Sequence, residues 1–310
     1  MVGAPSSFHG FEQEVAKLAD CKWAGEGYPE YKEGENIHET VTRVMPDADW
    51  VIANKNTLLP AKENRTYRVG VMLSDLHAKF DHNIFTAVMF REHLKTLNYD
   101  AFFMKYLEVH NTRVNPHLFK ESFNGQIYHL PWSINPERFT PLEKTVDASF
   151  LGRVGGIYPL RVSMWEDMYY ACRGYKIVRS LSPPGTTFDR DVNTIGHEYV
   201  GDKYSDLLNH TRIMLFGSSK YRYPVQKYFE ASASGCVMLA DNPSTAKRLG
   251  LKDRVNFVDV NEYDWRDEVQ YYLQDKEACL RIGESARVNA LEKHTHAVRA
   301  REFIEMINSA

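Results

Sequence analysis

The hydrophobic residues of this chain fall into short apolar runs that alternate with longer segments of helical spacing. Short runs are typical of buried strands, and apolar residues three or four positions apart are typical of helices packed on a sheet. In the first half, this pattern predicts strands at 50–53, 67–75, 101–106 and 126–132 and helices near 11–20, 37–45 and 83–97. Strands that alternate with helices in this way indicate a mostly parallel α/β sheet.

Prolines interrupt the pattern in LPWSINPERFTPLEK (130–144) and mark a linker. After it, strands are expected at 147–152, 176–181, 212–217, 236–241 and 255–260, and helices at 159–173, 202–209, 224–234, 264–274 and 276–308. We therefore expect an N-terminal domain over 1–132, a linker over 133–145 and a C-terminal domain over 146–310. Ligands bind in clefts between such domains and at the carboxyl ends of parallel strands.

Length and composition agree with two domains and exclude several other classes. The chain has 310 residues, of which 43% are hydrophobic and 25% charged, so disorder, collagen and coiled-coil arrays are excluded. A formal net charge of −3 gives no global attraction to nucleic acid or to anionic membranes, although a local basic cleft is compatible with this total. The four cysteines are far apart and form no CxxC pair, which argues against disulfide scaffolds and cysteine-based zinc sites.

The N-terminal sequence MVGAPSSFHG lacks the basic and apolar regions of a secretory signal. No stretch approaches the roughly 18 uninterrupted apolar residues of a membrane-spanning helix. Together with the cysteine pattern, these features predict a cytoplasmic protein without a membrane span.

The segment KYFEASASGCVMLADNPS (227–244) is the most informative for chemistry. Glu230 lies early in a helix of small residues that is followed at once by a buried strand. A carboxylate in this position can accept two hydrogen bonds from a vicinal diol such as a ribose. Capping of its own helix explains Glu230 equally well at this point, because the helix dipole favours an acid near the start.

This segment resembles the FEAMA-x-G-x-P-V block of GT-B glycosyltransferases, particularly the CgeB-like and family 4-like groups. Four further blocks resemble the same family in the same order. LPWSINPERFTP resembles the interdomain linker, and DASFLGRVGGIYPLR resembles the loop that opens the nucleotide domain. Residues 195–215 resemble the stretch before the donor site, and HTHAVRAREFIEMI resembles the C-terminal helix. The resemblance covers most of the chain beyond residue 130. It implies an α/β fold of GT-B type, with two Rossmann-like domains facing a cleft and a C-terminal helix that crosses back.

The implied activity is transfer of a hexosyl or pentosyl group (EC 2.4 type) from a nucleotide-diphosphate sugar to an acceptor hydroxyl. A UDP-sugar is the expected donor, and no separate cofactor is expected. Cations that neutralise the departing diphosphate remove the need for a metal, so we expect no metal site and a metal-independent enzyme. The family 4-like resemblance favours retention of the anomeric configuration.

The resemblance also implies donor-binding residues in the C-terminal half. Glu230 is assigned to the ribose, and the backbone near Glu198 and Tyr199 to the base. The residues assigned to the diphosphate and the donor sugar are Gly152, Arg153, Arg161, Lys227, Ser219 and Arg222. Gly152 belongs to a loop with two further glycines, whose backbone is able to approach a phosphate closely.

Asp75 and His77 follow the predicted strand at 67–75, in the sequence SDLHAKFDH. Either residue is a candidate to orient or deprotonate the acceptor hydroxyl, although a polar turn at the strand end explains both as well. The acceptor itself stays open between a glycan, a protein, a metabolite and a modified DNA base. The DNA alternative is motivated by a basic-leaning stretch that comprises Arg43, Lys55, Lys62, Arg65 and Arg68.

Two other functions remain compatible with the sequence. Arg222 stands where family 4 enzymes often carry the first acid of an E-x7-E pair, which motivates a non-catalytic protein that binds nucleotide sugars or acts in an assembly. A sugar-nucleotide epimerase of GT-B fold is the other alternative, but it requires several acids and bases around the donor. Asp47 and Asp49 imitate the D-x-D motif of metal-dependent transferases, yet they precede a strand, so we interpret them as a helix-to-strand turn.

Overall fold

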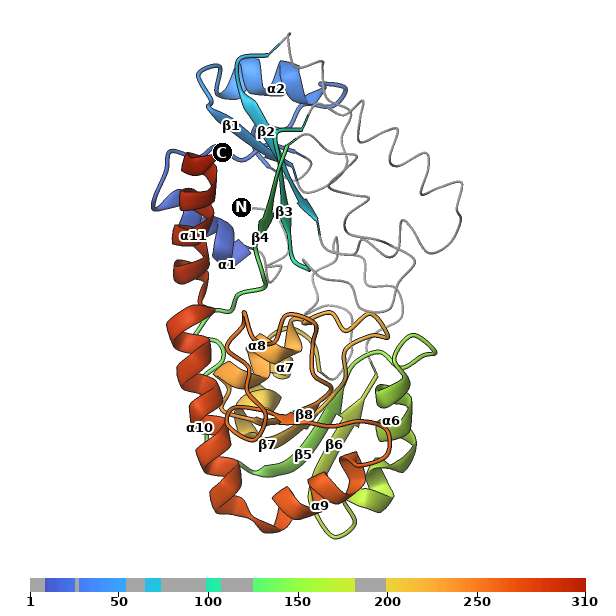
Figure 1. Cartoon of the computed structure of the whole chain (residues 1–310). Helices are drawn as coiled ribbons and strands as arrows, with labels where there is room; N and C mark the ends of the chain where they lie inside the picture. The colour runs from blue at the N-terminus through green and yellow to red at the C-terminus, as the bar shows by residue number, and fades with distance from the viewer. Residues whose placement is uncertain (1–8, 26–27, 54–64, 74–98, 107–124, 182–198) are drawn as a thin grey trace. The chain divides into compact units, whose positions relative to one another are not determined.

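A computed structural model gives the fold of the chain and describes residues 9–25, 28–53, 65–73, 99–106, 125–181 and 199–310 (Figure 1). The chain divides into two compact units. The first consists mainly of residues 12–131 and 300–310, and the second mainly of residues 132–299. The predictions that lie outside the described residues are the helix at 83–97 and the roles of Lys55, Lys62, Asp75, His77 and Glu198.

The first unit contains a four-stranded parallel sheet in the order β1-β2-β3-β4. Its strands are β1 (Trp50–Ala53), β2 (Arg68–Leu73), β3 (Ala101–Met104) and β4 (Gln126–His129). Its helices include α2 (Ile37–Val44) and α1 (His9–Ala16) from Glu12 onward. The α2 helix starts at a capping box, in which Asn36 and Glu39 each accept a hydrogen bond from the backbone of the other. This pair satisfies two backbone donors that a helix start leaves open.

Alternating side chains of the first sheet are buried on both of its faces. Val69, Val71 and Phe102 belong to one apolar cluster and are fully buried. On β3, the next residue, Phe103, stacks on Tyr128 and meets Phe303 of α11 (His296–Ser309) edge-on, with ring centroids 4.8 Å apart in the second contact. The end of α11 therefore packs with the N-terminal sheet, as expected for a C-terminal helix that crosses back.

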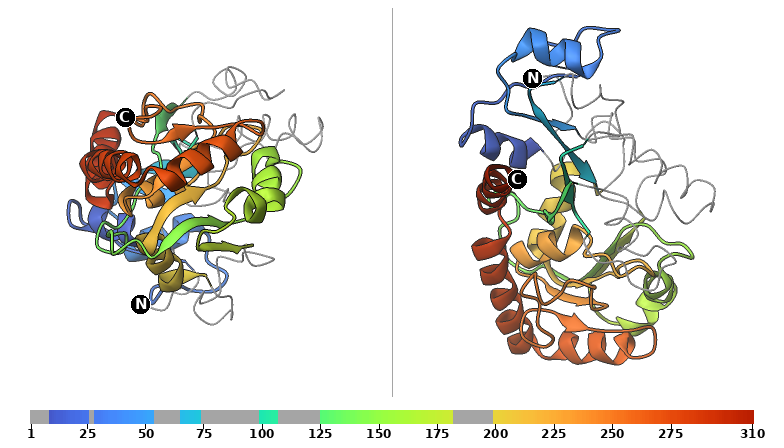
Figure 2. Two further views of the ribbon diagram at one scale, coloured as in Figure 1. Left: turned by 90° about the horizontal axis from the view of Figure 1, so that it is seen from below. Right: turned by 45° about the horizontal axis from the view of Figure 1, so that its top comes forward.

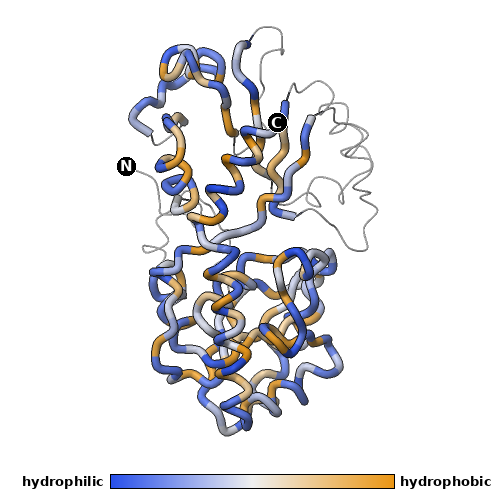
Figure 3. The backbone as a smooth tube through the Cα atoms, turned by 60° about the vertical axis from the view of Figure 1, so that its left-hand side comes forward, coloured by the Kyte–Doolittle hydropathy of each residue, from blue (hydrophilic) through white to orange (hydrophobic). Residues whose placement is uncertain are grey.

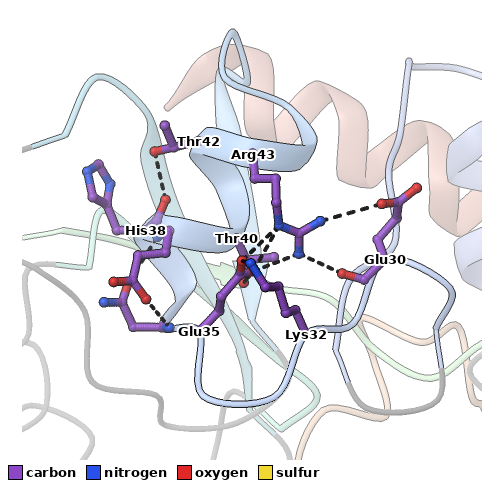
Figure 4. A network of polar contacts seen from close by, with 9 residues as sticks. Glu30, Lys32, Glu35, His38, Thr40, Thr42 and Arg43 are labelled. Atoms are coloured by element: carbon purple, nitrogen blue, oxygen red, sulfur yellow. Dashed lines mark hydrogen bonds and ion pairs between the residues drawn. The ribbon is translucent and has the colours of Figure 1, made fainter.

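The described arginines of the basic-leaning stretch have partners within the first unit. Arg43 forms a 2.6 Å ion pair with Glu35 on the exposed side of α2 (Figure 4). The hydrogen bonds from Arg43 lower the pKa of Glu35 to about 2. The side chain of Arg65 is fully buried and pairs with Asp100 at 3.2 Å, and Arg68 donates to the carbonyl oxygen of the last residue. These contacts explain the three arginines without a nucleic-acid ligand.

The second unit is built on a five-stranded parallel sheet in the order β6-β5-β7-β8-β9. Its strands are β5 (Val146–Leu151), β6 (Ile177–Ser180), β7 (Thr211–Leu215), β8 (Val237–Ala240) and β9 (Val258–Asp259). Numbered within the unit, this order is 2-1-3-4-5, that of an open doubly wound sheet. The first four strands lie within two residues of their predicted bounds.

The last strand is much shorter than the predicted 255–260, and this prediction is wrong in its extent. Asp253 and Phe257 form an isolated bridge, and the amide of Arg254 donates to the carbonyl oxygen of Phe257 at 2.7 Å. Arg254 has a φ of 56°. The chain therefore turns tightly before Val258 instead of running extended beside β8.

Helices cover both faces of this sheet (Figure 2). They are α6 (Pro159–Ala171), α7 (Gly201–His210), α8 (Lys227–Ala233), α9 (Trp265–Gln274) and α10 (Lys276–Lys293). One apolar cluster joins α7 and α8 to one face, another joins α6 and α9 to the opposite face, and α10 contributes to both. Apolar and polar positions are interspersed along the described backbone (Figure 3). The short α8 helix buries six of its seven residues.

The prediction of a single helix over 276–308 is wrong at one point, because α10 ends at Lys293 and α11 begins at His296. Between them, the backbone pairs with the linker segment. Ile134 donates its amide to the carbonyl oxygen of His294, and His296 donates its amide to the carbonyl oxygen of Ile134, both at 2.9 Å. Ser133 Oγ also lies 2.8 Å from Nδ1 of His296. These bonds occupy the carbonyl oxygen of His294 and the amide of His296, which a continuous helix would use for its own hydrogen bonds.

Two glycines allow α8 and α10 to approach closely. Gly235 follows α8 with a φ of 66°, and a Cβ atom on Gly283 of α10 would collide with the carbonyl oxygen of Gly235. Because backbone atoms cannot move aside as a flexible side chain can, we expect Gly283→Ala to lower the free energy of unfolding by about 1–3 kcal/mol. Urea unfolding followed by circular dichroism measures this loss.

The matched control is Glu284→Ala at the adjacent, exposed position of the same helix. We expect this change to stay within about 0.5 kcal/mol of the wild type. Equal unfolding free energies for Gly283→Ala and Glu284→Ala would contradict the close approach of the two helices.

Candidate functional site

The carboxyl ends of β5 and β7 lie side by side in the second sheet, with Phe150 opposite Leu215. The helix after β5 packs on one face of the sheet and the helix after β7 packs on the other. Open α/β sheets bind their ligands at such a point, where the direction of the connections reverses. The loop after β5 begins with Gly152, and the loop after β7 begins with Phe216 and Gly217.

Arg161 of α6 connects these two loops. Its side chain is 5% exposed, and its Nε donates to the carbonyl oxygen of Gly217 at 2.5 Å. Its Nη1 donates to the carbonyl oxygen of Arg153 at 3.3 Å, and its guanidinium lies 3.9 Å from the ring centroid of Tyr158. These contacts hold the guanidinium in place at the sheet edge. Arg153 contributes its backbone here, while its own side chain is exposed.

Lys227 is the first residue of α8 and brings a second cation to the same place. A Cβ atom on Gly152, which has a φ of 141°, would lie 3.1 Å from Nζ of Lys227 and 3.8 Å from Nη1 of Arg161. Within the described part of the chain, Lys227 forms no hydrogen bond or salt bridge. Burial, and then the positive charge of Arg161, lower the pKa of Lys227 to about 8, although Glu230 partly opposes this shift.

Glu230 lies on the same helix as Lys227, three residues later, and is 8% exposed. Its Oε2 accepts a 2.7 Å hydrogen bond from the hydroxyl of Tyr204 on α7. Burial raises the pKa of Glu230, against the opposing effects of the Tyr204 hydrogen bond and of the charges on Lys227 and Arg138. Gln226 holds the N-cap position of α8, so the carboxylate of Glu230 serves a contact with another helix rather than its own cap.

The other predicted donor residues lie on loops of the same unit. Ser219 is buried and its Oγ accepts a hydrogen bond from the amide of Tyr221 at 3.3 Å. Arg222 is exposed and has a φ of 53°, a left-handed conformation that is fixed by a 2.7 Å bond from its amide to the carbonyl oxygen of Ser219. Tyr199 is half-buried and packs against the apolar cluster that contains α7 and α8.

The sequence did not reveal Asp241 or Tyr204. Asp241 follows β8 and accepts a 2.5 Å hydrogen bond from the amide of Ser218, so it fixes the loop after β7. Asp241 could have been found from its position, because an acidic residue directly after a buried strand lies at the edge of the sheet where ligands bind. No spacing in the sequence indicated the contact between Tyr204 and Glu230, because the two residues belong to different helices.

The site therefore offers two kinds of chemistry at neighbouring positions. Two cations and the backbone of Gly152 meet at one end and suit an anion with several oxygens. Glu230 follows one helical turn after Lys227 and presents a buried carboxylate that suits hydroxyl donors.

The fold is similar to that of several solved glycosyltransferases. The Anabaena protein HepE, in complex with UDP-glucose, is 10% identical with a TM-score of 0.58, over 79% of this chain and 73% of HepE. AviGT4, a glycosyltransferase involved in avilamycin A biosynthesis, is 15% identical with a TM-score of 0.56, over 98% of this chain and 90% of AviGT4. A mutant of S. aureus TarM, in complex with fondaparinux, α-GlcNAc-glycerol and UDP, is 10% identical with a TM-score of 0.53, over 78% of this chain and 51% of TarM.

Residues 172–305, which contain β6 to α10 and most of α11, match the family described as glycosyl transferase-like. The chain has the GT-B fold of these glycosyltransferases. The predicted fold class is thereby confirmed, and the match over residues 172–305 agrees with the predicted family and enzyme class (EC 2.4 type). The CgeB-like subgroup stays a prediction. A comparison with curated proteins gives no match.

Two further features concern only the described part of this chain. None of its helices there is long and apolar enough to cross a membrane. The same residues include no group of three or more His, Cys, Asp and Glu side chains that is able to hold a metal ion. Metal independence and a cytoplasmic location stay predictions.

Proposed function

We propose that the second unit binds a UDP-sugar, with the diphosphate at Lys227, Arg161 and Gly152 and the ribose at Glu230. The observation that carries this proposal is the position of Lys227. It is a cation with a lowered pKa and no hydrogen bond or salt bridge to the described residues, and its Nζ lies beside the backbone of Gly152 and the fixed Arg161. An anion at this position compensates the cost of holding two positive charges together. The UDP-glucose complex of HepE supports uridine as the nucleoside.

The proposed reaction transfers the sugar to an acceptor hydroxyl. The bond between the anomeric carbon and the β-phosphate oxygen breaks, a bond from that carbon to the acceptor oxygen forms, and the acceptor hydroxyl gives its proton to Asp75 or His77. Negative charge grows on the departing diphosphate, and Lys227 and Arg161 stabilise it electrostatically. These two side chains support metal-independent transfer, and retention follows from the resemblance to family 4-like enzymes.

The remaining assignments belong to the same proposal. Ser219 and Arg222 are assigned to the donor sugar, and Tyr199 to the base. Asp75 or His77 is assigned to the acceptor hydroxyl. Among the acceptor classes, a glycan is favoured by the carbohydrate ligands of TarM.

The direct test is release of UDP from a panel of UDP-sugars, with and without a mixture of glycan acceptors, in buffer that contains EDTA. We expect UDP release that increases with acceptor and is unaffected by EDTA, and nuclear magnetic resonance of the product gives its anomeric configuration. Nucleotide binding without release from any UDP-, GDP- or ADP-sugar would indicate a non-catalytic binding protein. A donor sugar that changes configuration without acceptor would indicate an epimerase.

Gly152 gives a separate prediction for the diphosphate position. Its φ of 141° disfavours any side chain, and a Cβ atom there would lie 3.2 Å from Cε of Lys227. We expect Gly152→Ala to lower the unfolding free energy by about 1–2 kcal/mol and to weaken UDP binding about tenfold or more. Urea unfolding and calorimetric titration with UDP measure the two effects.

Gly155→Ala in the same loop is the control, because no atom lies within 4 Å of a Cβ at this position. We expect wild-type UDP affinity for this variant. If both alanine variants bind UDP as the wild type does, the diphosphate does not lie at Gly152.

A further inference from the structure

Tyr204 and Glu230 form a hydrogen bond between two helices of the second unit. The hydroxyl of Tyr204 on α7 donates to Oε2 of Glu230 on α8 at 2.7 Å. Burial and the charge of Glu230 raise the pKa of Tyr204 well above its ordinary value, so the hydroxyl keeps its proton and acts as a donor. A hydrogen bond from a phenol to a buried carboxylate fixes the rotamer of the acid.

The ring of Tyr204 packs against Phe139. It meets the ring of Phe139 edge-on, with centroids 6.4 Å apart. The carbonyl oxygen of Phe139 in turn accepts a 3.0 Å hydrogen bond from Arg287 of α10. The tyrosine is therefore part of a packed support and not a mobile side chain on the surface.

The two carboxylate oxygens of Glu230 have different surroundings. Oε2 is occupied by Tyr204, whereas Oε1 forms no hydrogen bond with any residue that the structure describes. Oε1 is also not fully enclosed by the surrounding atoms, unlike the buried polar atoms that lack a hydrogen-bond partner. Oε1 is thus the oxygen that is open to a ligand, and its direction depends on the bond that Tyr204 makes to Oε2.

We infer that Tyr204 is a positioning residue for nucleotide recognition, which orients Glu230 so that Oε1 alone receives the ribose hydroxyls of the donor. This inference rests on the proposed function and deepens it, since it divides the roles of the two carboxylate oxygens. If Tyr204 orients Glu230, then discrimination between ribose and deoxyribose depends on both residues and not on Glu230 alone. A carboxylate without Tyr204 is able to rotate and loses its fixed geometry toward the sugar hydroxyls.

The test is Tyr204→Phe, which keeps the ring against Phe139 and removes the hydroxyl. The probes are UDP-glucose and its 2′-deoxyribose analogue, each titrated calorimetrically. We expect the affinity for UDP-glucose to fall about tenfold, and the affinity for the deoxy analogue to fall much less, so the ratio of the two shrinks. This ratio is measured within one variant and is independent of any general loss of stability.

A pH profile of UDP-glucose binding gives a second readout. UDP-glucose has no terminal phosphate, the group whose second ionisation lies near pH 6, so the ligand keeps its charge in this range. The hydrogen bond from Tyr204 lowers the pKa of Glu230 against the effect of burial, so its removal raises that pKa further. We expect the acidic limb of the binding profile to move to higher pH in Tyr204→Phe.

Tyr272→Phe is the matched control, because Tyr272 is a buried tyrosine of α9 in the apolar cluster on the opposite face of the sheet. We expect wild-type affinity and wild-type discrimination for this variant. An unchanged ratio and pH profile in Tyr204→Phe, with wild-type protein that binds UDP-glucose, would overturn the inference alone. Wild-type protein that binds no UDP-glucose would overturn the proposed function together with it.

Discussion

Replacing Lys227 by methionine is expected to abolish detectable UDP binding and, at the same time, to stabilise the unliganded chain. Methionine retains much of the length of the side chain and removes its charge. The pKa of Lys227 is lowered from 10.5 to about 8, which corresponds to a cost of about 3 kcal/mol for the charged form in the folded protein. We therefore expect an unfolding free energy about 1–3 kcal/mol higher for Lys227→Met at pH 7, because methionine removes this cost.

The loss of binding follows from the same charge. A diphosphate that loses one of two cations at this site is expected to bind at least a hundredfold more weakly. Thermal unfolding with and without UDP measures both effects in one experiment, since a ligand that binds the folded state raises its stability. Lys276→Met is the control: Lys276 is also the first residue of a helix, α10, but it is exposed. A destabilised Lys227→Met that still responds to UDP would refute this interpretation.

The pH dependence has a defined sign. Because the folded-state pKa of Lys227 lies below the unfolded value, the unfolded chain binds more protons between about pH 8 and pH 10.5, and the contribution of this lysine to stability rises with pH there. UDP binding needs the protonated amine, so affinity is expected to fall above about pH 8. Lys227→Met removes the effect of this lysine from both profiles.

The second large effect is expected for Glu230→Gln, which keeps the shape of the side chain and removes its charge. Hydrogen bonds from ribose hydroxyls to an ionised carboxylate are stronger than those to an amide. We expect UDP-glucose to bind about ten- to a hundredfold more weakly. Pyrophosphate, which has no ribose, is expected to bind as well as before or better, because a negative charge near Lys227 is gone.

Calorimetric titration with both ligands separates the two ends of the site. Lys227→Met is expected to weaken UDP-glucose and pyrophosphate together, whereas Glu230→Gln weakens UDP-glucose alone. Equal losses of both ligands in Glu230→Gln would show that Glu230 acts on the fold or on the diphosphate, and not on the ribose.

Much of this architecture is contained in local patterns of the sequence. Seven of the nine described strands have both ends within two residues of the prediction, whereas β4 ends three residues early and β9 begins three residues late. Such runs are readable because the central strands of a parallel sheet bury their side chains on both faces, as β3, β7 and β8 do. The order of the motifs also predicted that Gly152, Arg161, Lys227 and Glu230 belong to one site, and the structure brings the first three together and places Glu230 one turn beyond them.

Features that depend on distant partners were not readable in this way. The break between α10 and α11 exists because residues 294–296 bond to Ile134, which lies far away in the sequence. The bond from Tyr204 to Glu230 joins two helices, and no periodicity encodes it. The length of β9 was overestimated because an apolar run does not show where a tight turn begins.

The central claim is that the diphosphate of the donor lies at Lys227, beside Arg161 and Gly152. The most direct measurement is calorimetric titration of the wild-type chain and of Lys227→Met with UDP in the presence of EDTA at pH 7. We predict saturable binding of one UDP per wild-type chain and no measurable binding to Lys227→Met. Binding of equal affinity to both proteins, or no saturable binding of UDP to the wild type, would contradict the claim.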